Sequence, residues 1–158
     1  MEKSVYLRSK YLESAVIMIL IFFIDIYTKN LALENLLLNY PLEINNFFNL
    51  TLVYNYGAAF SILSDAGGWQ KWLFIIISII IISYLHILLR IDNSENKIAL
   101  SLVIGGALGN LFDRITYGYV IDFLEFHYQN FYWPIFNFAD ITITIGLIML
   151  IYSLCWKK

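Results

Sequence analysis

Charged residues are scarce in this sequence. Asp, Glu, Lys and Arg make up 14% of the 158 residues, whereas hydrophobic residues make up 60% and the mean hydropathy is +0.70. A soluble domain needs many more polar side chains to cover its surface, so this composition excludes an ordinary soluble protein. The sequence therefore predicts an integral membrane protein.

Cysteine and histidine are almost absent. Cys155 is the single cysteine, so no intramolecular disulfide can form, and we expect it to be a small apolar packing residue. The two histidines, His86 and His127, are predicted to lie on opposite sides of the membrane. Because no group of residues has the spacing of metal ligands, we expect no metal and no cofactor.

Four apolar stretches approach or reach the roughly 20 residues that a helix needs to cross about 30 Å of hydrocarbon. They span residues 11–31, 72–89, 98–115 and 135–156. We therefore predict an all-α membrane protein with four transmembrane helices in one domain, residues 1–158, and with outer loops at residues 36–68 and 116–134. The first stretch follows a basic region, as in a signal peptide, but its length and the lack of a small-residue cleavage site predict that it remains as an anchor.

The distribution of Lys and Arg predicts the orientation of the chain. Seven of the ten basic residues fall on the side of the two termini: Lys3, Arg8, Lys10, Arg90, Lys97, Lys157 and Lys158. The other three are Lys29, Lys71 and Arg114. Since cytoplasmic loops carry an excess of Lys and Arg, both termini are predicted to be cytoplasmic and the two long loops to face outward.

The first outer loop contains a candidate strand and a candidate binding residue. Residues 48–55 largely alternate between apolar and polar side chains, which favours a short strand over a helix. Asn55 can be a turn former or a group that hydrogen-bonds a bound peptide, and the residues leave both possibilities open. Gly57 is small enough to let another backbone or a lipid approach closely.

Two polar faces interrupt the apolar second half of the chain. Asn110, Asp113 and Arg114 lie three and four residues apart, so they share a helix face. Asn137 and Asp140 repeat that spacing beyond the second outer loop. A charged group at membrane depth costs roughly 2.5 to 3.5 kcal/mol on insertion scales, so such residues usually face a protein interior and mark function. We therefore expect the two faces to point at each other in an active site.

Three further charged residues extend this candidate site. Asp122 lies in an alternating run, residues 120–128, that is typical of an extended segment and can bring its carboxylate over the helix ends to pair with Asp140. In the first span, Asp25 and Lys29 are four residues apart and can meet on one helix face. They can form a local ion pair that lowers the cost of burial, or they can point into a shared polar cavity.

The depth of these charges favours a site that opens to the outer surface. Asp25, Asp113 and Asp140 all fall in the outer third of their predicted helices at 1.5 Å per residue. A transporter is expected to place such residues near the midplane of the membrane. From the residues alone, two alternatives to an enzyme nevertheless remain. One is a small proton-coupled transporter or channel that uses Asp25, Lys29, Asp113 and Asp140 as a relay, and the other is a membrane scaffold without enzymatic activity.

Five motifs follow one another along the chain: DIYTK at 25–29, NYGAAF at 55–60, GGALGNLFDR at 105–114, GYVIDF at 118–123 and FNFAD at 136–140. Together with four correctly placed spans, they resemble the bacterial lipoprotein signal peptidases (signal peptidase II). Each motif alone is weak, but five in order are highly specific. One departure is Ile26, where family members usually have Gln, and it affects a supporting contact rather than the chemistry.

The resemblance implies a membrane aspartic endopeptidase of the bacterial inner membrane. Such an enzyme removes signal peptides from prolipoproteins and cuts before a cysteine that carries diacylglycerol. Asp122 and Asp140 match the catalytic pair. The positions that match substrate-binding or supporting residues are Asp25, Lys29, Asn55, Gly57, Asn110, Asp113, Arg114 and Asn137.

The resemblance also implies a small outer β-sheet, formed by the first outer loop, and a short amphipathic helix on the membrane surface. The expected partners are lipid-modified prolipoproteins and membrane lipids, with no nucleic acid, and the chain is expected to be monomeric. Because two close carboxylates cannot both ionise cheaply, the pair should share a proton near neutrality. The ionised member can then activate water while the protonated member polarises the scissile carbonyl. These two roles cannot be assigned to Asp122 or Asp140 individually, since the protons belong to the coupled pair.

Overall fold

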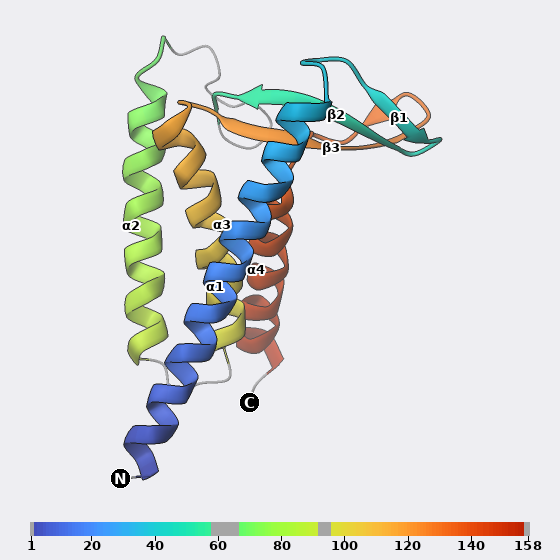
Figure 1. Cartoon of the computed structure of the whole chain (residues 1–158). Helices are drawn as coiled ribbons and strands as arrows, with labels where there is room; N and C mark the ends of the chain where they lie inside the picture. Colours follow the sequence, from blue (N-terminus) through green and yellow to red (C-terminus); the bar gives the residue numbers. More distant parts are fainter. Residues whose placement is uncertain (1, 58–66, 92–95, 157–158) are drawn as a thin grey trace.

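Four helices make up most of the computed structural model, which describes residues 2–57, 67–91 and 96–156, with side chains from residue 11 onward. They are α1 (Glu2–Asn35), α2 (Gln70–Ile91), α3 (Lys97–Thr116) and α4 (Phe138–Trp156). The helices run side by side as one bundle, and the start of α1 and the end of α4 lie at the end of the bundle opposite to the sheet (Figure 1).

Each helix contains a stretch that is long and apolar enough to cross a membrane, which confirms the prediction of four spans. The stretches are Tyr11–Asn35, Gln70–Ile91, Lys97–Thr116 and Phe138–Trp156. Two bounds of these stretches differ from the prediction by three or four residues, and the others by at most two. The first helix continues to Asn35 instead of ending at 31, because residues 32–35 include no helix breaker. The fourth begins at Phe138 instead of 135, because Phe136 still pairs with the backbone of Leu124 at 3.1 and 2.8 Å.

Helix α3 is the centre of the bundle. Twelve of its 20 residues are buried, against three of the 22 residues of α2, so α2 lies at the outside of the bundle. Glycines let α3 approach its neighbours closely. A Cβ on Gly105 would lie 3.0 Å from the Cβ of Ile21 on α1, and a Cβ on Gly106 would lie 2.5 Å from the carbonyl oxygen of Ala139 on α4.

A four-stranded antiparallel sheet lies at one end of the bundle and projects to its side (Figure 1). Its strands, in spatial as well as chain order, are β1 (Leu42–Asn45), β2 (Phe48–Asn55), β3 (Val120–Tyr128) and β4 (Phe131–Tyr132). The predicted extended segments at 48–55 and 120–128 are both strands. The expectation that the first outer loop alone forms the sheet is wrong, because the second outer loop supplies β3 and β4.

The sheet is attached to the bundle by a small apolar core. Ala32, near the end of α1, packs with Leu52 of β2 and with Ile121 and Phe123 of β3. Because successive side chains of a strand point to opposite faces, Asp122 lies on the other face of the sheet from Ile121 and Phe123. The packing of α1 against one face therefore leaves Asp122 to face the helix ends of α3 and α4.

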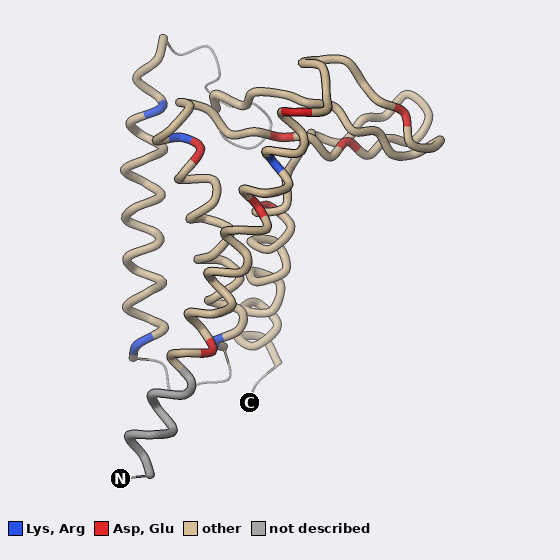
Figure 2. The backbone as a smooth tube through the Cα atoms, in the orientation of Figure 1, with Lys and Arg blue, Asp and Glu red and all other residues tan. Residues whose placement is uncertain are grey.

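Charged residues lie mostly toward the two ends of the bundle, and the middle parts of α2 and α4 are free of them (Figure 2). This distribution is what a hydrocarbon layer around the middle of a multi-pass membrane protein requires. Among the described residues there is no short amphipathic surface helix, and residues 58–66 of the first outer loop, which include Ala58 and Ala59 of the NYGAAF motif, lie outside them.

Candidate active site

The polar face at the end of α3 meets both α1 and the sheet. Asp113 accepts a hydrogen bond from the backbone N–H of Ile121 at 3.2 Å and pairs with Lys29 at 2.8 Å. Arg114, its neighbour in the sequence, points elsewhere, as the 100° between successive helix residues predicts. Asp113 on this face therefore forms an ion pair with α1, whereas Arg114 makes a separate contact.

Lys29 is the hub of a buried polar network between α1 and α3. Its Nζ lies 2.7 Å from Asp25 Oδ2, 2.8 Å from Asp113 Oδ2 and 2.9 Å from Asn110 Oδ1. Lys29 is 1% exposed and Asp25 is fully buried. The local ion pair predicted from the sequence is therefore present, and the same ammonium also reaches α3. Removing one partner from such a buried network typically costs about 3 to 5 kcal/mol.

Asp25 joins α1 to the start of α4. Its Oδ1 accepts a hydrogen bond from the backbone N–H of Ala139 at 2.9 Å. Ala139 is the second residue of α4, where backbone N–H groups have no partner within the helix. Gly109 of α3 makes room for this carboxylate, because a Cβ at that position would overlap Asp25 Oδ2. The glycine is thus required by the close approach of a charged side chain.

We expect Gly109→Ala to destabilise the protein. The added methyl group would push Asp25 away from Lys29 or force α1 and α3 apart, and such overpacking typically costs about 1 to 3 kcal/mol. The measurement is the Tm of the purified variant in detergent. The matched control is Ile115→Ala on the same helix, since the side chain of Ile115 is exposed and its loss should leave the Tm nearly unchanged. Equal melting temperatures for Gly109→Ala and the wild type would contradict the tight fit of Asp25.

Asp140 is held by the helix that it helps to begin. Asn137 precedes α4, and its Oδ1 accepts the backbone N–H of Asp140 at 3.0 Å. In return, Asp140 Oδ2 accepts the backbone N–H of Asn137 at 3.2 Å. This reciprocal arrangement is a capping box, and it satisfies two N–H groups at the helix start. The positive end of the helix dipole also favours a negative charge there.

Asp122 reaches the same place from the sheet. Gly118 has a φ of +88°, which favours glycine and lets the chain turn from α3 into β3. Antiparallel pairing then places Asn55 of β2 opposite Val120, two residues before Asp122 on the same face. Asn55 Nδ2 donates to Asp122 Oδ2 at 3.0 Å, and Asn137 Nδ2 donates to Asp122 Oδ1 at 2.7 Å.

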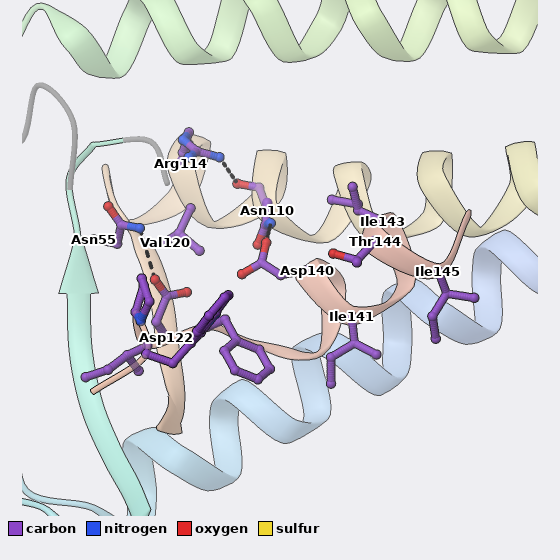
Figure 3. Close-up of a pocket in the computed structure, with 14 residues that line it drawn as sticks. Asn55, Asn110, Arg114, Val120, Asp122, Asp140, Ile141, Ile143, Thr144 and Ile145 are labelled. Atoms are coloured by element: carbon purple, nitrogen blue, oxygen red, sulfur yellow. Dashed lines mark hydrogen bonds between the residues drawn. The ribbon is translucent and has the colours of Figure 1, made fainter. Parts of the chain in front are cut away.

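The carboxylates of Asp122 and Asp140 face each other across a cavity of about 570 Å³ (Figure 3). Asp140 Oδ1 accepts a hydrogen bond from Asn110 Nδ2 at 2.8 Å. All four carboxylate oxygens of the pair therefore accept hydrogen bonds from amide N–H groups. The apolar wall of the cavity comes from Val120, Trp133, Pro134, Ile135, Phe136, Ile141, Ile143 and Ile145.

Burial and, to a smaller extent, the nearby charge of Asp140 raise the pKa of Asp122 to about 7. The hydrogen bonds that Asn55 and Asn137 donate oppose this change, because they stabilise the carboxylate. The pair is therefore able to hold one proton near neutral pH. This is the condition under which one carboxyl group can act as an acid and the other as a base.

The raised pKa predicts how stability depends on pH. In the unfolded chain Asp122 titrates near its ordinary value of 3.8, but in the folded protein it keeps its proton up to about pH 7. The unfolded state therefore binds fewer protons between these two values, and the stability contributed by this group is lost as the pH rises through that window. In Asp122→Asn the decline of Tm between about pH 5 and 7 should be shallower than in the wild type. Identical Tm profiles would contradict the raised pKa.

Arg114 and Gly57 form the outer border of the site. Arg114 Nη2 donates to the carbonyl oxygen of Gly57 at 3.2 Å, and the guanidinium lies 5.3 Å from the ring centre of Phe74 on α2. The backbone N–H of Gly57 donates to Asn55 Oδ1 at 3.0 Å. The Gly57 segment is thus held on both sides, and it links the arginine to the asparagine that contacts Asp122.

His127 and Cys155, which the sequence did not assign to the site, lie away from the carboxylate pair. Within residues 11–57, 67–91 and 96–156, no group of three or more His, Cys, Asp or Glu side chains is placed to hold a metal ion. His127 stacks on Tyr132 in the sheet, with ring centres 5.2 Å apart. Cys155 is exposed on the last turns of α4, so the expectation that it packs inside the protein is wrong. A thiol on the lipid-facing surface needs no protein partner.

All ten predicted site residues lie at the sheet end of the bundle and are joined by the contacts above. The apolar wall, which comes from β3, from the segment before α4 and from α4 itself, was missed, because apolar residues in so apolar a chain carry no distinguishing signal. The capping role of Asp140 was missed as well, since the fourth helix was expected to begin at 135. Its signal is visible in the sequence: Asn137 followed three residues later by an acidic residue is typical of a helix start.

The fold and the site define a multi-pass membrane protein with a buried carboxylate pair beside an apolar cavity, an arrangement that suits an aspartic peptidase. Residues 17–156 match the signal peptidase (SPase) II family. The chain belongs to the signal peptidase II family and is a peptidase. This membership resolves the choice that the residues left open between an enzyme, a transporter and a scaffold.

Similar proteins cover almost the whole chain. A lipoprotein signal peptidase of Pseudoalteromonas atlantica is 46% identical over 143 residues, which cover 89% of this chain and 87% of that protein. One of Francisella tularensis is 47% identical over 156 residues, which cover 96% of each protein. A solved structure of a bacterial membrane enzyme is 34% identical and superimposes with a TM-score of 0.80 over 92% of this chain and 94% of the other.

Proposed function

We propose that Asp122 and Asp140 are the catalytic pair with which this chain cuts diacylglyceryl-modified prolipoproteins before the lipidated cysteine. The removal of signal peptides from prolipoproteins follows from the family to which the chain belongs. The observation that carries the catalytic assignment is the position of the two carboxylates, which face each other at the wall of the cavity (Figure 3).

The hydrogen bonds of the pair support an acid–base mechanism. Each carboxylate oxygen already accepts one N–H on the protein side, so the remaining lone pairs and the shared proton are directed to the partner or to the cavity. The ionised member takes a proton from water, whose oxygen attacks the scissile carbonyl carbon, while the protonated member donates its proton to the carbonyl oxygen. Collapse of the tetrahedral intermediate then breaks the C–N bond: the leaving amine takes the proton that the first carboxylate received from water, and a hydroxyl of the intermediate returns a proton to the second carboxylate, so the pair again holds one proton.

The apolar wall of the cavity is consistent with the proposal that the substrate is lipidated and apolar. The cavity continues along α4 past Asp140, where Ile141, Ile143 and Ile145 line it (Figure 3). Apolar side chains at this depth favour the hydrocarbon part of a substrate, and the cleaved bond must lie beside the carboxylates at the polar end. The diacylglyceryl group and the apolar part of the signal peptide are the substrate parts that fit this arrangement.

The proposed orientation follows the basic residues. The termini, with seven of the ten Lys and Arg residues on their side, are assigned to the cytoplasm, and the sheet end with the carboxylate pair is assigned to the outer face of the inner membrane. One chain supplies every residue of the site described above, so a monomer is sufficient for activity. Membrane lipids are the expected surroundings of the exposed faces of the helices.

We expect different effects from Asn55→Ala and Arg114→Ala. Asn55 donates to Asp122 from a strand end, so its loss should remove one hydrogen bond from the pair and lower the cleavage rate roughly ten- to a hundredfold, with little change in Tm. Arg114 holds Gly57 and packs over Phe74, so its replacement should lower both Tm and rate. Equal losses of Tm for the two variants, or full activity of Asn55→Ala, would contradict these roles.

The experiment that tests the proposed substrate compares two synthetic prolipoprotein peptides that differ in the diacylglyceryl group on the cysteine. The purified protein in detergent should cut the lipidated peptide directly before the cysteine, as mapped by mass spectrometry, and should cut the unlipidated peptide far more slowly. Equal rates for both peptides would contradict lipid recognition. Cleavage at another bond would contradict the proposed position of the scissile bond.

A further inference from the structure

We propose that Lys29 is a positioning residue for the carboxylate pair, because it fixes the side-chain amide of Asn110 so that the N–H group of this amide faces Asp140. The inference rests on the proposed catalytic role of Asp122 and Asp140. It adds a specific function to a lysine that otherwise looks like part of a buried ion pair.

The three N–H groups of the Lys29 ammonium are all engaged. They point to Asp25 at 2.7 Å, to Asp113 at 2.8 Å and to Asn110 Oδ1 at 2.9 Å. An ammonium is a donor with no acceptor capacity, so the atom of Asn110 that faces it must be the carbonyl oxygen. Two of the three contacts are ion pairs, and the third sets the direction of a neutral amide.

This direction determines what Asn110 presents to the catalytic pair. With its oxygen on Lys29, the amide places Nδ2 on Asp140 Oδ1 at 2.8 Å. A reversed amide would place an NH2 group against the ammonium and an oxygen against the carboxylate, which are two repulsive contacts in a buried site. The charge of Lys29 therefore selects the orientation in which Asn110 donates to Asp140.

Asn110 differs in this respect from the other two asparagines of the site. The amide oxygen of Asn55 accepts the backbone N–H of Gly57 at 3.0 Å, and that of Asn137 accepts the backbone N–H of Asp140 at 3.0 Å. Backbone groups thus orient both of these amides. The amide oxygen of Asn110 is held by side chains, namely Lys29 and the Nδ2 of Asn137 at 3.1 Å. Asn110 is therefore the asparagine whose orientation depends on other side chains, on Lys29 together with Asn137, and Lys29 is the charged one of these two donors.

A double-mutant cycle separates this positioning role from a merely structural one. Lys29→Gln and Asn110→Ala are measured singly and together for kcat on a lipidated prolipoprotein peptide, with the amount of folded protein determined in each case. Each single change should lower kcat roughly ten- to a hundredfold. If Lys29 acts through Asn110, the double variant should be about as active as the less active of the two single variants. The reason is that the effects of two substitutions do not add when both remove the same interaction. Single effects that multiply in the double variant would overturn the proposal.

The matched control is a buried acid outside this network. Glu125 of β3 is 8% exposed and accepts hydrogen bonds from Asn49 at 2.9 Å and from Thr51 at 2.7 Å. Whatever Glu125→Gln does to kcat, its effect should multiply with that of Asn110→Ala, because the two residues share no partner. Coupling of the same size in both cycles would mean that any loss of packing produces it, and would overturn the specific role of Lys29.

Asn110→Asp tests the orientation when Lys29→Gln fails to fold. The aspartate keeps the shape of the residue and keeps an oxygen on Lys29, but it places a second carboxylate oxygen against Asp140, so Tm should fall and kcat is measured per amount of folded protein. It presents an oxygen instead of an N–H to Asp140, so kcat should fall at least about a hundredfold. Near-normal kcat in a folded Asn110→Asp would overturn the inference. The proposed catalytic pair would fail independently, through activity in Asp122→Asn or Asp140→Asn.

Discussion

Asp122→Asn is expected to abolish cleavage of a lipidated prolipoprotein peptide while the protein still folds and inserts into the membrane. The amide keeps the shape of the carboxyl group, but it can neither hold the shared proton nor accept one from water. Loss of acid–base catalysis of this kind typically costs about 10²- to 10⁴-fold in rate. The measurement is the single-turnover cleavage rate, in detergent, at matched concentrations of folded protein.

The control for this variant comes from the same strand. Glu125→Gln replaces another buried acid of β3, but Glu125 bonds to Asn49 and Thr51 in the sheet and does not line the cavity. It should therefore retain most of the activity. Substantial cleavage by Asp122→Asn would remove Asp122 from the catalytic pair, and equal losses in both variants would show that the integrity of the sheet, rather than the carboxyl group, is being measured.

Asp140→Asn is expected to abolish cleavage as well and, in contrast to Asp122→Asn, to lower Tm. Asp140 closes the capping box of α4, and its charge lies at the positive end of the helix dipole, where a carboxylate typically contributes about 0.3 to 1 kcal/mol. An asparagine can still accept the N–H of Asn137 but brings no charge. Thermal melting of the two variants side by side provides the comparison.

The predicted fall in Tm and the predicted loss of cleavage for Asp140→Asn can each be contradicted separately. If Asp140→Asn melts at the temperature of the wild type, the capping box does not depend on the charge of Asp140. If it cleaves the peptide at a substantial rate, Asp140 does not belong to the catalytic pair. Both outcomes can be read from the same purified sample, so the two roles of this residue are tested separately.

Local patterns in the sequence were sufficient for the four helices and for the two longer strands of this fold, but not for the short strands β1 and β4. Four apolar stretches predicted four helices, and alternation predicted the strands at 48–55 and 120–128, because both signals depend on neighbouring residues. The polar face with Asn110 and Asp113 was visible for the same reason. Charged side chains in apolar surroundings are expensive, so even isolated ones marked the site.

Contacts between distant parts of the chain were not predictable in this way. Spacing identified Asp25 and Lys29 as a pair, but it contained no sign that Lys29 also reaches Asp113 and Asn110 of another helix. The contribution of the second outer loop to the sheet was likewise missed, since strand pairing depends on where the helix ends bring the loops. The residues that complete the catalytic pair come from four separate segments, and their meeting is a property of the packed bundle.

Cleavage in the presence of EDTA, by the wild type and by the double variant Asp122→Asn/Asp140→Asn, tests the central claim most directly. The substrate is a prolipoprotein peptide with diacylglycerol on its cysteine, and mass spectrometry identifies the products. The wild type should cut before the lipidated cysteine at an undiminished rate with the chelator present, and the double variant should not cut. Cleavage by the double variant, or loss of wild-type activity on chelation with recovery on addition of Zn²⁺, would contradict catalysis by the aspartate pair.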